Sequence, residues 1–349
     1  MTTPSGQISL DDVNIELSIS PGTQINMNSA PVRGLAEVPT GAIAMSDLQN
    51  KSNAQFVAAT GGSVVTSGDF KIHTFTSSGT FTVSNGGNPA GSDTVEYLVI
   101  AGGGGGGATG GGGGGAGGYR EVFPVPATGG LPVSAQAYPI TVGAGATGGT
   151  NSNRGGAPDT RGNIGSNSVF STITSAGGGG GGTENGGPLR PAHSGGSGGG
   201  AGARGGSGGA GNTPPTSPPQ GNSGGNGNGP IGGSQDRGAG GGGAGGAAEN
   251  ANEPNSVGAG PGSTSSINGT PTTRAGGGGG GVGPGNQQTF VNGGGALGGA
   301  PESVSPNAGS NATANTGGGG GGGAMSGNHG PANGGTGGSG LVIIRYKFQ

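Results

Sequence analysis

Five runs of six or seven consecutive glycines constrain this chain more than any other feature. The runs extend from Gly102 to Gly107, Gly110 to Gly115, Gly177 to Gly182, Gly276 to Gly281 and Gly317 to Gly323. Each glycine costs a helix about 1 kcal/mol relative to alanine, so such a run forms no stable α-helix. The extended polyproline II conformation instead leaves every backbone N–H and C=O pointing outward. We therefore expect the runs to lie side by side as rods whose backbone groups bond one another.

Glycine is concentrated after the first hundred residues. Of the 100 glycines, 11 lie in residues 1–100 and 89 in the remaining 249. A strict Gly-X-Y period is absent and proline accounts for only 24 residues, which excludes a collagen triple helix. Disorder is the usual state of a glycine-rich chain without a period, and it is the alternative against which any fold is weighed.

Side-chain burial alone cannot hold the glycine-rich part together. Hydrophobic residues make up 27% of the chain and aromatic residues 3%, too few for a core along its whole length. Backbone hydrogen bonds must take over much of that role. Because glycine loses the most conformational entropy on ordering, we expect strong pairing at the ends of this part.

Charge and cysteine content exclude several classes of partner and site. The net charge is −3 and only 8% of residues are charged, so the chain lacks the basic surface that binds nucleic acid or an anionic membrane. Cysteine is absent, so disulfides and thiol chemistry are excluded. No apolar stretch is long enough for membrane insertion, and the start of the chain lacks a secretory pattern. We expect a protein that is made in a host cytoplasm and stays soluble there.

Residues 1–92 are predicted to form three small units. In residues 1–52, period-two alternation from Ile8 to Ile19 predicts a strand, and residues 32–38 predict one helical turn. Residues 53–63 are small and polar and are predicted to be a linker. In residues 64–92, the alternating segments 70–76 and 80–83 predict a β-hairpin. Because about fifty residues are marginal as an independent unit, residues 1–52 are expected to dock on a partner or self-associate.

Two apolar segments bracket the glycine-rich domain, residues 93–349. Val95 to Ile100 leads into the first glycine run, and Leu341 to Phe348 ends the chain. If unpaired, the terminal Leu-Val-Ile-Ile strand would be an aggregation hazard. We predict that the two segments pair and hold the ends of the domain together. Further strands are predicted at residues 119–125, 137–142 and 167–174, so that the fold class is mainly β with a polyglycine II helix bundle between β-strands.

The N-terminal unit resembles a module of tailed-phage structural proteins. The similarity extends from Ile8 to Ser52 and includes Gly-Ala-Ile-Ala-Met-Ser-Asp-Leu at residues 41–48, followed by Lys51-Ser52. Ala44 departs from the serine more usual in that group. The resemblance implies that residues 1–52 attach the chain to other virion tail proteins.

The glycine-rich part is similar to the glycine-rich domain of phage tail-fibre proteins and adhesins. Four motifs occur in order: Val-Glu-Tyr-Leu-Val-Ile-Ala-Gly-Gly-Gly, Tyr-Pro-Ile-Thr-Val-Gly-Ala-Gly, Ser-Val-Phe-Ser-Thr-Ile-Thr-Ser-Ala-Gly-Gly-Gly and Gly-Ser-Gly-Leu-Val-Ile-Ile-Arg-Tyr. Some members are tip adhesins built from packed polyglycine II helices with variable loops at the distal end. The resemblance implies a rigid scaffold with receptor-contacting loops.

The residues give little support for catalysis. The three histidines, His73, His193 and His329, have no carboxylate at metal-ligand spacing. Carboxylates are scattered singly along the chain. Glu249 and Glu253 are four residues apart in a loop, and we do not expect them to form the pair of catalytic carboxylates that a glycosidase needs. Gly-x-Gly-x-x-Gly occurs repeatedly, but no helix is predicted after any run and no lysine lies within one, so a phosphate loop is excluded. We expect no enzyme activity, no metal and no cofactor.

The candidate recognition surface is the set of loops between glycine runs, at residues 183–194, 212–237, 246–274 and 296–315. Loops on a rigid support are the usual place for binding residues, but these contain no tryptophan or tyrosine. Solvated connectors are an equal alternative. The candidate receptor contacts are Arg190, Asn212, Thr216, Gln220, Arg237, Asn250, Asn252, Arg274, Asn307 and Asn311.

The sequence thus predicts a phage tail-fibre or tail-tip protein, located in the virion, that contributes to recognition of a host cell-surface protein or glycan. The alternative is a non-adhesive virion structural or decoration protein that serves as spacer or spike. An ice-binding bundle would need regularly spaced runs and is disfavoured. A homotrimer is common among fibres, but no heptad coiled coil is present to support one. A single copy that caps a fibre is an equal alternative.

Overall fold

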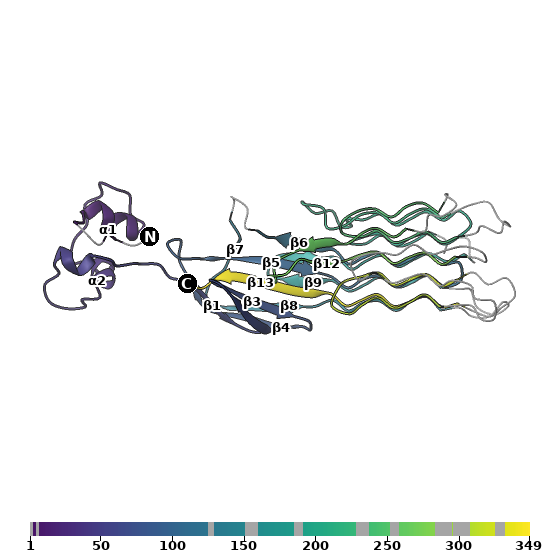
Figure 1. Ribbon diagram of the computed structural model, residues 1–349, viewed down its shortest axis with the longest axis horizontal. Coiled ribbons are helices and arrows are strands. Elements are labelled where there is room, and N and C mark those ends of the chain that lie inside the picture. Colours follow the sequence, from purple (N-terminus) through teal and green to yellow (C-terminus); the bar gives the residue numbers. More distant parts are fainter. Residues whose placement is uncertain are drawn as a thin grey trace.

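The computed structural model describes residues 3–4, 7–124, 129–150, 160–184, 191–227, 237–251, 258–282, 295, 308–324 and 332–349. Three parts follow one another along the long axis (Figure 1). A small helical module comes first, a β-sandwich lies in the middle, and extended glycine-rich segments run away from the sandwich. Both chain termini lie on the side of the sandwich opposite these segments.

The N-terminal module is helical where a strand was expected. Its elements are α1 (Leu10–Glu16), α2 (Ala30–Ala36) and the short 3-10 helix η1 (Met45–Leu48). The prediction of a strand from Ile8 to Ile19 is wrong because Ser9 and Asp12 form a capping box, in which Ser9 N–H donates to the Asp12 carboxylate at 2.6 Å. The apolar residues also fit helical spacing, and Val13 is fully buried while Leu10 is 45% exposed. The helical turn predicted at residues 32–38 overlaps α2.

Two antiparallel sheets form the sandwich. The first contains β1 (Val57–Thr60), β4 (Gly79–Gly86), β8 (Ala137–Thr141), β9 (Ser168–Phe170) and β10 (Ile173–Ser175), in that order. The second has the order β2 (Ser63–Ser67), β3 (Phe70–Phe75), β13 (Leu341–Lys347), β5 (Thr94–Ile100) and β6 (Tyr119–Val122), with β7 (Leu131–Pro132) paired to β5. The predicted linker 53–63 therefore contains strand β1 and the start of β2.

The strongest pairing predicted from sequence is confirmed. β13 lies between β3 and β5, with Leu341 opposite Ile100 and Arg345 opposite Glu96. The predicted hairpin of residues 70–83 is wrong, because β3 and β4 belong to different sheets and do not pair. β3 pairs instead with β13 over six residues. The strand predicted at residues 167–174 is divided into β9 and β10 by a turn in which Ser171 has φ +53°.

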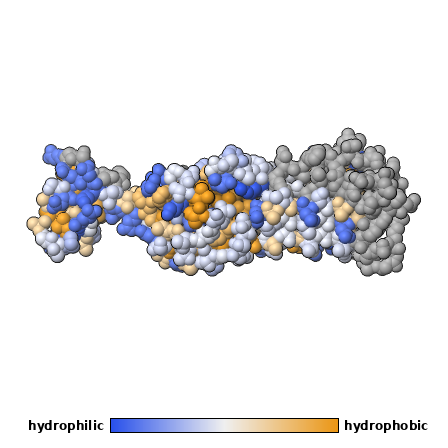
Figure 2. Space-filling view, turned by 60° about the horizontal axis from the view of Figure 1, so that its bottom comes forward, coloured by the Kyte–Doolittle hydropathy of each residue, from blue (hydrophilic) through white to orange (hydrophobic). Residues whose placement is uncertain are grey.

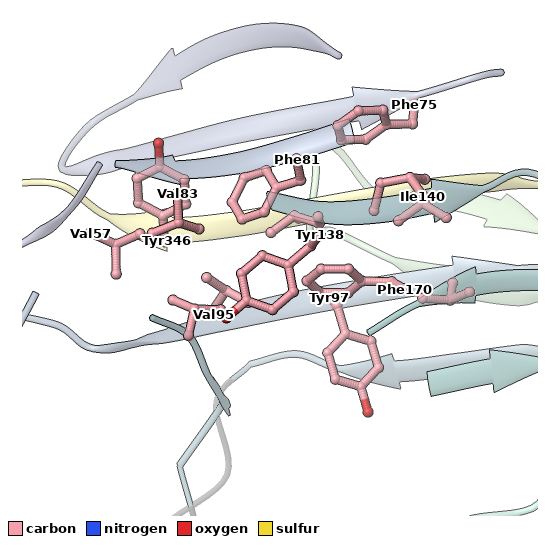
Figure 3. Packing of buried hydrophobic residues seen from close by; sticks show 14 residues of the cluster. Val57, Phe75, Phe81, Val83, Val95, Tyr97, Tyr138, Ile140, Phe170 and Tyr346 are labelled. Atoms are coloured by element: carbon pink, nitrogen blue, oxygen red, sulfur yellow. The ribbon is translucent and has the colours of Figure 1, made fainter. Parts of the chain in front are cut away.

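The main core fills the space between the two sheets. The side chains of Phe81, Tyr138 and Phe170 lie between strands of the two sheets (Figure 3). The Phe81 and Phe170 rings meet edge to face with centroids 6.0 Å apart. His73 is fully buried here, with Nδ1 2.7 Å from the Gly61 carbonyl oxygen and Nε2 3.1 Å from the Tyr346 hydroxyl. Burial holds the pKa of His73 below its ordinary value.

The opposite face of the second sheet is covered by a hairpin that the sequence did not predict. β11 (Ser263–Ser265) and β12 (Thr272–Arg274) pair antiparallel, and Ile267 between them is fully buried. Ile267 packs in one cluster with Leu98 of β5 and Ile343 of β13. Strands β5 and β13 are consequently buried on both faces, which gives the joined ends of the glycine-rich domain their apolar support.

Beyond β5, the chain continues as rod 102–107, which hydrogen-bonds neighbouring segments with a period of three residues. Every third amide donates to the same neighbour at 2.9–3.0 Å: Gly102 and Gly105 to Ser166 and Asn163, Gly103 and Gly106 to Gly338 and Gly335, Gly104 and Gly107 to Gly115 and Gly112. Its carbonyls accept from three other segments, 146–149, 178–181 and 320–323. Six segments thus surround this rod.

Rod 111–118 is surrounded in the same way. Its amides donate to segments 176–182, 239–242 and 317–323, and its carbonyls accept from 101–107, 197–200 and 278–281. The two rods form the centre of the bundle, where the glycines are buried. As expected, the backbone N–H and C=O groups of neighbouring glycine runs hydrogen-bond one another in this part of the chain.

The close packing of the rods explains why their residues are glycine. A Cβ atom on Gly113 would overlap the Gly278 carbonyl oxygen, and one on Gly103 would overlap the Gly318 carbonyl oxygen. In both cases the obstacle is backbone that itself belongs to a bonded rod. No side chain could be added there without separating two rods.

A single added methyl group in the bundle centre should therefore destabilise the domain. We expect Gly113→Ala to lower the free energy of unfolding by about 3 kcal/mol or more, since overpacking against backbone cannot relax by rotamer change. Gly246→Ala is the matched control, because its Cβ would meet only the Pro261 ring at 3.3 Å. Urea denaturation measures both. Equal, small effects of the two variants would contradict the packing described.

Candidate functional site

The end of the bundle remote from the sandwich, called the distal end below, is built around the turn that joins the two central rods. Thr109 N–H donates to the Ala332 carbonyl at 3.0 Å, and the Thr109 carbonyl accepts Glu184 N–H at 3.1 Å. The Gly110 carbonyl accepts Ala203 N–H at 2.9 Å. Segments that are far apart in sequence therefore meet at one small surface.

Buried polar and charged residues gather at this end. Arg204 Nη2 lies 2.7 Å from Glu184 Oε1, and the Glu184 side chain is only 6% exposed. Thr183 is fully buried, and Arg237 is 4% exposed and forms a β-bridge with Val282. The ion pair links the turn at residues 203–206 to the neighbouring segment, and loss of Arg204 would leave the buried Glu184 carboxylate without this cation. Sequence reasoning did not single out Arg204, since only the fold brings it to Glu184.

The structure divides the predicted receptor contacts between two opposite ends of the bundle. Arg190, Asn252 and Asn307 lie outside the described residues. Arg237 and Asn250 lie toward the distal end, and Asn311 is on an outer segment. Asn212, Thr216, Gln220 and Arg274 lie at the sandwich end, where Gln220 bonds Tyr119 and Ala176 at the ends of β6 and β10. These residues form no single surface.

The loop 212–220 is held closed by its own side chains. Asn212 Oδ1 accepts the amides of Thr216 at 3.0 Å and Gln220 at 3.2 Å. Gln220 is 1% exposed, its Oε1 accepts Ala176 N–H at 2.8 Å, and its Nε2 donates to the Pro214 carbonyl at 2.8 Å. Gln220 and Arg237, which is 4% exposed, are both too buried to contact a receptor.

Arg274 belongs to a half-buried polar group between the β11–β12 hairpin and the second sheet. The Tyr119 hydroxyl donates to Glu121 Oε2 at 3.1 Å. Burial raises the pKa of Glu121 and of Tyr119 and lowers the pKa of the Arg274 guanidinium. Glu121 Oε1 and Arg274 Nη1 are buried without a hydrogen-bond partner among the described residues. The group supports the hairpin and lies away from the distal end.

Asparagine, serine and threonine side chains cap backbone amides on outer segments of the bundle. Asn250 Oδ1 accepts Asn226 N–H at 2.8 Å, and Asn311 Oδ1 accepts Thr336 N–H at 2.9 Å. The same device recurs for the amides of Gly208, Ala210, Asn315 and Thr150, which donate to Asn226, Ser194, Ser339 and Thr160. An outer segment lacks a rod on one side, so a side-chain oxygen takes the place of the missing carbonyl.

The described residues contain no group of three or more histidine, cysteine or acidic side chains that could hold a metal ion. In the same part of the chain, no helix has the length and apolar character needed to cross a membrane.

The capping role of Asn311 can be measured directly. Asn311→Ala should speed amide exchange at Thr336 and lower the free energy of unfolding by about 0.5–1 kcal/mol, since a solvent-exposed amide regains water in place of the lost acceptor. Asn163→Ala is the control, because its side chain donates to Thr147 Oγ1 at 2.7 Å and caps no amide of the residues that the structure describes. Unchanged exchange at Thr336 would show that the Asn311 side chain is free for other contacts.

Comparison with known proteins identifies the family but gives no close relative. No curated protein matches the chain. A family model described as a glycine-rich domain matches residues 75–347, which include both clamping strands β5 and β13, and the rods between them. The chain therefore belongs to the glycine-rich domain family.

Proposed function

We propose that this chain is a structural protein of a tailed-phage virion, a tail fibre or tail tip, whose distal end contributes to recognition of the host surface. The observation that carries the proposal is the order of the parts along the long axis (Figure 1). The helical module lies at one end, and the central turn 108–110 with the Glu184–Arg204 ion pair lies at the other.

The rods are proposed to be polyglycine II helices. This is supported by the period of three residues in their hydrogen bonds, which matches three residues per turn of the polyproline II conformation. Hydrogen bonds in several directions around each central rod make the bundle resistant to bending in any plane. Such a bundle suits a protein that must hold a recognition surface at a fixed distance from a particle.

Residues 1–52 are proposed to attach the chain to other tail proteins. The module has its own small core of Val13, Val32, Leu35, Ala36 and Leu48. Leu10 and Ile15 of α1 remain 45% and 41% exposed. Exposed large apolar residues on a small module supply contact area for a partner.

Recognition is assigned to the distal end because residues at the sandwich end are committed to the scaffold. Gln220 and Asn212 hold the loop closed there, and Arg274 is half-buried in the hairpin. The hydrogen-bonded segments around Thr109 give the distal end a rigid support, and loops on such a support are the usual carriers of binding function.

The absence of cysteine allows this proposal to be tested by labelling single introduced thiols. Ser207→Cys places a thiol on an exposed residue beside the distal turn 203–206, and Ser166→Cys places one on an exposed residue at the sandwich end. Each variant of the full-length chain is coupled to a bulky polyethylene glycol maleimide. Its binding to cells of the bacterium that the phage infects is then measured by flow cytometry.

We expect the bulky group at position 207 to abolish cell binding and the group at position 166 to leave it unchanged. Immunogold labelling of phage particles with antibodies to the chain should mark the tail. Virion labelling without cell binding would overturn the recognition role and favour the spacer or decoration role. Particles without label would overturn the virion assignment itself.

A further inference from the structure

Strand β2 (Ser63–Ser67) is an unprotected edge of the second sheet. It pairs with β3 on one side, from Ser63 opposite Thr74 to Ser67 opposite Phe70. No backbone hydrogen bond among the described residues reaches its other side. All five residues are exposed, and this holds for no other described strand. Val64 and Val65, on opposite faces of the strand, are 48% and 60% exposed.

Two other sheet edges carry protection that β2 lacks. β1, at an edge of the first sheet, has a register shift between Ala58 and Ala59 and buries Val57. β6, at the other edge of the second sheet, is half-buried and carries Arg120 and Glu121. Natural edges are kept from pairing by charges, proline, bulges or cover. Ser63-Val64-Val65-Thr66-Ser67 has no charge and no proline, and its β-branched residues favour strand pairing.

We propose that two copies of this chain pair through β2, antiparallel and about Val65. The five residues read almost the same in both directions, which a two-fold interface requires. Val65 would then lie opposite Val65, Val64 opposite Thr66 and Ser63 opposite Ser67. No like charges meet, and β-branched residues stand in cross-strand pairs, the favourable arrangement in sheets.

Assembly through β2 stops at two chains, because the pairing occupies the one free side of β2 in each copy. The two sandwiches join into one continuous sheet across the molecular two-fold. Apolar residues gather on the face of the sandwich that Figure 2 shows. A five-residue strand with two valines buries less than a standard interface. The dimer is therefore concentration-dependent, with a dissociation constant on the order of micromolar.

Sedimentation velocity of the full-length chain across a concentration series tests this. The wild type should shift from monomer to dimer as concentration rises. Val65→Lys should weaken the dimer at least about tenfold, because it places two ammonium groups opposite each other. Val65→Thr keeps the β-branched shape and should keep the dimer. Ile164→Lys is the surface control, since Ile164 is 52% exposed and lies on segment 160–166, away from β2.

Because Val65 is largely exposed, the lysine variant should unfold at the same temperature as the wild type, which checks that folding is intact. A chain that stays monomeric at all concentrations overturns the proposal. So does a trimer, or a dimer that Val65→Lys leaves unchanged. These outcomes do not depend on the role proposed for the distal end.

Discussion

The structure depends on backbone hydrogen bonding between rods that consist almost entirely of glycine. A core of packed apolar side chains would need far more than the 27% hydrophobic residues present. Around rods 102–107 and 111–118 the neighbouring chain lies close enough for amide and carbonyl groups to bond at 2.7–3.1 Å. That closeness is possible only because glycine has no Cβ, as the Gly113–Gly278 approach shows. The high glycine content and the bundle of rods therefore have one physical cause, which is the close approach of hydrogen-bonded backbones.

The other parts of the chain serve this arrangement. Ordering so many glycines loses conformational entropy, and the β5–β13 pair offsets part of that loss by joining the ends of the domain inside two apolar layers. Outer segments lack neighbours on one side, and asparagine, serine and threonine oxygens replace the missing carbonyls. The polar side chains between glycine runs thus have a structural task before any recognition task.

Sequence reasoning succeeded where a physical requirement leaves one solution. Paired terminal strands and mutually bonded glycine runs followed from the distribution of apolar residues and glycine. It failed where two solutions share a pattern: residues 10–16 fit both a strand and a helix, and only the Ser9–Asp12 capping box decides. Alternation in β3 and β4 predicted strands but not their partners. The β11–β12 hairpin, the Asn311 cap and the Glu184–Arg204 pair arise from contacts between distant segments, which no local pattern reports.

Residue-resolved hydrogen exchange on the full-length chain tests the account most directly. All amides of rod 102–107 should exchange slowly, because each one donates to a neighbouring rod. In the outer segment 144–149, Ala146 and Gly149 donate to rod 102–107 and should be protected, whereas Gly145 and Gly148 have no backbone acceptor among the described residues and should exchange faster. The predicted result is slow exchange at every third amide of segment 144–149. Rapid, uniform exchange through both segments would contradict the bonded bundle.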